Sequence, residues 1–177
     1  NDQEPGVITF DIDTTSSDTC GTTESGAPYS VPLGTITTTN SKVSGSTDGV
    51  NNICIDLDTN ASTGAAITVA NANGANGLVS VSAGGDGINS SDGSIANGTE
   101  NYGLCIVSSS TTTGILDDES GYNGDTCAAN SETNNVQALS TTPEMIFDTN
   151  GGEVTGGRGQ ISVNASISTT TPAHSGY

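Results

Sequence analysis

The sequence has few of the residues that build most catalytic and nucleic-acid-binding sites. It contains no tryptophan, only two phenylalanines and one histidine, and two basic residues, Lys42 and Arg158, against 20 Asp and Glu. The formal charge of −18 repels phosphate backbones and anionic lipid surfaces. We therefore expect neither nucleic-acid binding nor membrane insertion.

The chain also lacks apolar stretches of the roughly 18 residues that a membrane-spanning helix needs, and it shows no helical amphipathic period. Its apolar residues, 31% of the total, occur in short alternating runs, for example at residues 7–12 and 161–167. Such alternation is typical of half-buried strands. The sequence thus predicts an all-β protein.

Strands are predicted at intervals, separated by turns rich in Gly, Asn, Asp and Pro. This spacing favours a single Ig-like or jelly-roll antiparallel β-sandwich of about eight or nine strands. We expect the sandwich to span residues 13–177, with residues 1–12 ahead of it as an N-terminal extension. The predicted strands are 7–12, 29–37, 52–58, 65–70, 78–82, 102–108, 136–140, 145–148 and 159–168.

The four cysteines, Cys20, Cys54, Cys105 and Cys127, include no CxxC pair, which argues against a zinc site. An even number of cysteines instead indicates two disulfides, which form in oxidising compartments. Three pairings exist for four cysteines. We favour Cys20–Cys54 and Cys105–Cys127, because each joins a long predicted loop to a strand.

No catalytic constellation is apparent. The one histidine, His174, follows a Thr-Pro-Ala turn near the end of the sequence, and a serine or cysteine nucleophile needs a base held beside it. Carboxylate pairs that cleave glycosides usually work with aromatic platforms, which this sequence scarcely offers. We expect no enzymatic activity and no cofactor.

Asp56, Asp58 and Asn60 resemble the opening of a calcium loop. The EF-hand pattern then requires Gly and Glu, where this sequence has Ala61 and Ile67. We therefore interpret the two aspartates as outward-facing strand residues. Adventitious calcium at the three side chains remains the alternative.

Four sequons predict N-linked glycans. Asn164 alternates away from the apolar Val163 and Ala165, so we expect it to face solvent. The four acceptor residues are Asn60, Asn89, Asn97 and Asn164.

Near the beginning of the chain, Val7, Ile8, Phe10 and Ile12 form an apolar series interrupted by Thr9 and Asp11. A segment of this kind can fill pockets on a neighbouring sheet while its backbone pairs with an open edge. The same pattern suits the first strand of its own sandwich. The residues alone do not separate the two readings.

Three motifs resemble recurring patterns of exported, Ig-like surface proteins of bacteria: TNASTG at 59–64, GTENYGL at 98–104 and VNASISTTTPA at 163–173. The chain is also similar in style to donor-strand-exchange filament subunits, such as TasA-like proteins, archaeal bundling pilins and chaperone–usher pilins. The resemblance implies an Ig-like fold outside the cell and identifies no catalytic residue.

In those surface proteins the TPA-x-x-Y segment usually leads into one more hydrophobic strand, whereas this sequence stops at Tyr177. We therefore expect an incomplete sandwich whose open edge is covered by Val7, Ile8, Phe10 and Ile12 of another copy. The predicted function is a structural subunit of an extracellular filament or pilus at the cell surface, a homopolymer assembled head to tail. The alternative is a monomeric adhesin that binds carbohydrate or protein, such as host or biofilm-matrix components.

Overall fold

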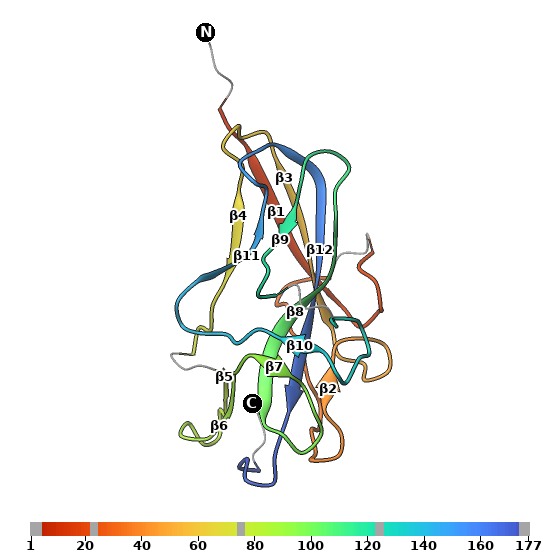
Figure 1. Cartoon of the computed structure of the whole chain (residues 1–177), viewed down its shortest axis with the longest axis vertical. Helices are drawn as coiled ribbons and strands as arrows, with labels where there is room; N and C mark the ends of the chain where they lie inside the picture. Colours follow the sequence, from red (N-terminus) through yellow and green to blue (C-terminus); the bar gives the residue numbers. More distant parts are fainter. Residues whose placement is uncertain (1–4, 22–24, 74–76, 123–125, 174–177) are drawn as a thin grey trace.

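The computed structural model describes residues 5–21, 25–73, 77–122 and 126–173. Across these residues all regular elements are strands, and no helix is long and apolar enough to cross a membrane. The longest strands run roughly along the long axis of an elongated molecule (Figure 1). The prediction of an all-β, antiparallel, disulfide-linked fold consistent with a β-sandwich is confirmed.

The main sheet is organised around its longest strand, β12. Along one side β12 pairs first with β3 and then with β2, and along the other side it pairs with β8. β1 pairs with β3 and forms an edge of this sheet. The strands are β1 (Ile8–Thr15), β2 (Lys42–Val43), β3 (Asn52–Thr59), β8 (Asn101–Ser110) and β12 (Val154–Ser166).

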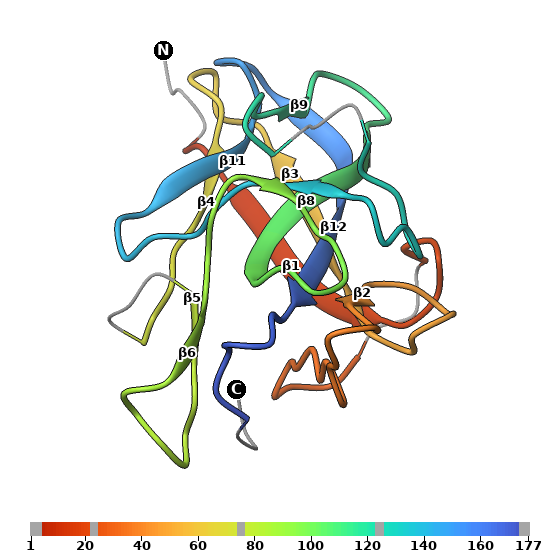
Figure 2. The same cartoon turned by 60° about the horizontal axis from the view of Figure 1, so that its bottom comes forward.

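A second sheet, in the order β4-β11-β9, lies over the main sheet (Figure 2). β9 contacts β8, so β4 lies toward the side of the sandwich that holds β1. Two small ladders, β5-β6 and β7-β10, complete the described elements. These strands are β4 (Ala66–Val69), β5 (Gly77–Val79), β6 (Gly87–Asn89), β7 (Gly93–Ser94), β9 (Asp117–Asp118), β10 (Asn135–Val136) and β11 (Glu144–Asp148).

The main core fills the space between the two sheets. Ile55 and Leu57 point into it from β3, and Phe147 enters it from β11. Phe147 fits because β12 carries a glycine beneath its ring: an ideal Cβ on Gly159 would lie 2.5 Å from Phe147 Cζ. Most of the short apolar runs of the sequence thus contribute to this core.

β12 is also buried on its outer face, where a second, more polar layer covers it. Asn164 is fully buried there: its Oδ1 accepts a hydrogen bond from Asn134 Nδ2 at 2.9 Å, and its Nδ2 donates to the Ser162 carbonyl at 3.0 Å. A small cluster of Val43, Ile95, Cys105 and Val136 belongs to this layer. Our expectation that Asn164 faces solvent was therefore wrong, and in the folded protein its amide cannot carry a glycan.

The predicted strand at residues 29–37 does not form, apart from one isolated bridge at Thr37. The segment still contributes Val31, Leu33 and Ile36 to the edge of the main core, which explains its apolar alternation. Pro32 lies in the middle of the segment and has no N–H to donate to a ladder. Apolar alternation alone could not show that residues 29–37 pack against the core without forming hydrogen bonds to a neighbouring strand.

The tight packing at Gly159 can be tested by adding one methyl group. We expect Gly159→Ala to destabilise the protein by about 1–3 kcal/mol, because the new Cβ overlaps the Phe147 ring. Gly84→Ala is the matched control, since an ideal Cβ there has nothing within 4 Å. Urea unfolding of the two variants measures the difference, and equal midpoints would contradict the packing described here.

Candidate assembly surface

The N-terminal segment forms the edge strand of its own sheet. β1 pairs with β3 without a break, from Ile8 opposite Thr59 to Thr15 opposite Asn52. The predicted division after Ile12 falls within this strand. The single chain does not leave this edge of the sandwich vacant, as we had expected, because its own β1 occupies the position.

The other edge of β1 has no strand partner among the described residues. At Thr14 the backbone N–H points away from β3 and donates to Ser25 Oγ at 2.9 Å. In an antiparallel pair alternate residues point the same way, so the peptide groups of Ile8, Phe10 and Ile12 also point to this outer edge. The N-terminal half of β1 thus presents backbone donors and acceptors for a further strand.

The apolar side chains of this half-strand are only partly covered. Ile8, Phe10 and Ile12 lie on the core-facing side of β1, and Ile12 is partly buried against the core. Val7, Ile8 and Phe10, which we call the apolar ridge, remain 55%, 57% and 46% exposed. Apolar side chains beside an uncovered strand edge favour association with another chain.

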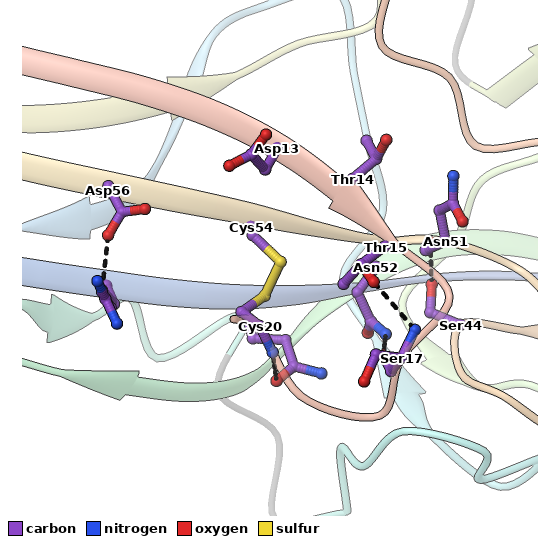
Figure 3. Close-up of a disulfide and its surroundings, with 12 residues drawn as sticks. Asp13, Thr14, Thr15, Ser17, Cys20, Ser44, Asn51, Asn52, Cys54 and Asp56 are labelled. Atoms are coloured by element: carbon purple, nitrogen blue, oxygen red, sulfur yellow. Dashed lines mark hydrogen bonds and ion pairs between the residues drawn. A yellow bond between two sulfur atoms is a disulfide. The ribbon is translucent and has the colours of Figure 1, made fainter. Parts of the chain in front are cut away.

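The C-terminal end of β1 is firmly attached to the main sheet. The Cys20–Cys54 disulfide ties the following loop to the outer face of β3, with a Cα–Cα distance of 5.7 Å (Figure 3). Gln160 on β12 reinforces this link: its Nε2 donates to the Asp18 carbonyl at 3.0 Å, and its Oε1 accepts from the Cys20 N–H at 3.4 Å. Both predicted disulfides, this one and Cys105–Cys127, are present.

The Asp18 carboxylate joins the loop after β1 to two other loops. Its Oδ1 accepts hydrogen bonds from the Ser46 N–H and from Asn130 Nδ2, both at 2.7 Å, and its Oδ2 accepts from Ser46 Oγ at 3.1 Å. The Ser46 N–H, followed by the two side-chain donors, lowers the pKa of Asp18 from its ordinary value. Sequence analysis missed Asp18, because its partners lie far along the chain.

The candidate calcium ligands are each engaged by a different protein donor. Asp56 Oδ1 accepts from Arg158 Nε at 2.9 Å, and Asp58 Oδ1 accepts from the Gly156 N–H at 2.5 Å. Asn60 Oδ1 accepts from the Val7 N–H at 2.6 Å. Within the described part of the chain no group of three or more His, Cys, Asp or Glu residues is arranged to hold a metal.

The other predicted site residues are dispersed over the surface. Asn60, Asn89 and Asn97 are exposed, so three of the four predicted sequons remain accessible. Asn60 alone lies beside the N-terminal strand, since it contacts Val7. His174 lies outside the described residues.

The Asp18 contacts predict an acid-sensitive loop. A carboxylate with a lowered folded-state pKa contributes stability that is present above its unfolded pKa of about 4 and is lost as the pH falls through the folded value. Asp18→Asn removes this titrating group, so we expect the stability difference between wild type and variant to shrink as the pH falls below about 4.

Urea unfolding at several pH values measures this difference, and carboxyl NMR titration reports the pKa of Asp18 directly. Glu153→Gln, which removes one charge at an exposed position, is the control for the general effect of net charge. A stability difference for Asp18→Asn that stays constant down to pH 2 would contradict the assignment.

Comparison of the chain with protein-family models, with curated proteins and with solved structures finds no significant match.

Proposed function

We propose that this chain is a structural subunit of an extracellular filament or pilus, joined head to tail to the next copy by donation of β1. The observation that carries the proposal is the N-terminal half of β1. Among the described residues it is an edge strand whose outer backbone has no strand partner, and its side chains Val7, Ile8 and Phe10 are about half exposed.

Donation requires only that β1 pair with β3 of another copy in place of its own. The antiparallel register and the contacts with β3 are the same in both cases, because β1 lies at the sheet edge and near the chain terminus. Exchange of an identical element is a low-cost route to association, and its extent depends on protein concentration. If the exchange does not close on itself, it propagates as a filament.

The disulfide limits how far the donated strand can reach. Cys20 is fixed to Cys54 on its own body, so only Ser16–Thr19 can straighten when β1 leaves. An extended chain from Thr15 to Cys20 spans about 17 Å. Neighbouring sandwiches in such a filament must therefore touch.

This direct contact matters for the apolar ridge. Exchange by itself leaves Ile8 and Phe10 as uncovered as they are in the single chain. The proposal therefore includes burial of the ridge by the adjoining copy, which would supply hydrophobic stabilisation of about 25 cal/mol per Å² of apolar surface.

An extracellular location fits the two disulfides, which persist in oxidising compartments. The exposed sequons at Asn60, Asn89 and Asn97 are consistent with it.

A ligand-binding module is less well supported. The hollow beside the Cys20–Cys54 disulfide has a volume of about 180 Å³, below the roughly 300–1,000 Å³ of ordinary ligand pockets.

The ridge can be tested by placing a charge within it. We expect Phe10→Asp to abolish filaments of the purified protein, because a carboxylate would be buried without a partner at the junction. Val81→Asp is the matched control: Val81 is 90% exposed, in the turn between β5 and β6, far from β1 in the fold (Figure 1).

Negative-stain microscopy at equal protein concentrations measures the result, and circular dichroism checks that both variants are folded. Filaments of wild type and of Val81→Asp, with none of Phe10→Asp, would support the proposal. A wild type that remains monomeric at all concentrations would contradict it.

A cysteine pair across the β1–β3 ladder distinguishes strand donation from simple packing of intact copies. Thr9 and Asp58 are directly opposite each other, at a separation that suits a disulfide. If β1 is donated, oxidation of assembled Thr9→Cys/Asp58→Cys filaments should link successive copies covalently. Non-reducing gels should then show a ladder of oligomers that collapses on reduction. Monomer bands alone would mean that every copy keeps its own β1.

A further inference from the structure

The residues that hold the start of β1 belong to the TNASTG motif, which the proposed function does not otherwise use. The geometry points to Thr59, Asn60 and Ala61 as a strand-recognition clamp, which binds the backbone of residue 7 and sets the register of β1. The ligand of this clamp is the N-terminal strand of this chain. That the strand comes from a second copy rests on the proposed function.

The clamp engages both polar groups of one residue. The Val7 N–H donates to Asn60 Oδ1 at 2.6 Å, and the Val7 carbonyl accepts from Thr59 Oγ1 at 3.0 Å and from the Asn60 N–H at 3.3 Å. All three contacts are to the Val7 backbone. They therefore recognise an extended backbone at residue 7 and do not depend on the identity of its side chain.

The Thr59 hydroxyl is oriented for this role. It accepts a hydrogen bond from the Ala61 N–H at 3.0 Å, and its own proton is then directed to the Val7 carbonyl. Thr59 is 5% exposed. If the Val7 carbonyl moved away, the buried Thr59 hydroxyl would lose the acceptor of its proton, which costs free energy.

The remaining motif residues shape the clamp. Ala61 lies close to the residue before Val7: an ideal Cβ on Gly6 would lie 3.3 Å from Ala61 Cβ, a tight contact that favours glycine at this position. Gly64 adopts a φ of +74°, and an ideal Cβ there would lie 2.2 Å from Thr149 Oγ1. The turn after Ala61 therefore requires glycine.

The sequence of the strand matches the clamp at one register only. A slip of one residue would turn Ile8, Phe10 and Ile12 to the other face. A slip of two residues keeps the face, but in one direction it brings Pro5, which has no N–H, to Asn60. In the other direction it brings Ile8 to the position of Gly6, against Ala61. The first of these two-residue slips loses the hydrogen bond to Asn60 and the second crowds a side chain against Ala61, so the clamp favours the register in which Val7 is bound.

The test uses full-length variants at position 60 and measures hydrogen exchange of the Val7 amide by NMR on dilute monomer. Asn60→Ala removes the acceptor, and we expect exchange to become about fivefold faster, the factor that corresponds to a hydrogen bond of ~1 kcal/mol. Asn60→Asp keeps an oxygen acceptor and should remain close to wild type. Ser62→Ala removes the sequon but keeps Asn60, and should also behave like wild type.

The same variants are then heated as filaments, and the dissociation temperature is followed by light scattering. Lower values for Asn60→Ala but not for Ser62→Ala would support the clamp in the assembled state. Unchanged Val7 exchange in Asn60→Ala, or equal acceleration in Asn60→Asp, would overturn it. If wild type forms no filaments while Val7 exchange still depends on Asn60, the clamp stands and the filament proposal fails.

Discussion

In the part of the chain that the structure describes, β1 pairs with one strand, β3, and this one-sided pairing determines how the N-terminal segment can interact. At its C-terminal end the loop that follows is anchored by the Cys20–Cys54 disulfide and by the Asp18 contacts. At its start β1 is held through the backbone of Val7. Between these points its outer edge faces away from the sheet. The strand is therefore secured in register while one side of it stays available.

Only 31% of the residues are apolar, and the fold that supports this edge also packs polar side chains in its interior. β12 is an example. One face of β12 contributes Ile161, Val163 and Ala165 to the main core, and the other contributes Ser162 and Asn164 to a hydrogen-bonded layer. Both faces of the strand are thereby closed to water. Buried amides and hydroxyls that are paired in this way carry little penalty.

The charge of the protein constrains how copies can meet. Lys42 pairs with Asp48 at 2.7 Å and Arg158 pairs with Asp56 at 2.9 Å, so both basic side chains already have acidic partners. Two copies with a formal charge of −18 repel each other at long range. At physiological salt this charge repulsion is screened beyond about 8 Å. Attraction between copies must therefore come from short-range contacts. Backbone pairing and apolar burial at β1 are interactions of this kind.

The alternation of apolar residues was enough to predict an all-β fold, and the placement of cysteines in loops and strands was enough to favour the correct disulfides. Both are local signals, because side-chain alternation follows from the pleat of a strand and a loop gains from a tether wherever it lies. Tertiary structure alone decided that residues 29–37 pack without pairing and that Asn164 is enclosed by a second layer. It also decided that β1 completes its own sheet and that Asp18 joins three loops. These outcomes depend on which distant segments meet, and a pattern read along one strand carries no information about what covers its outer face.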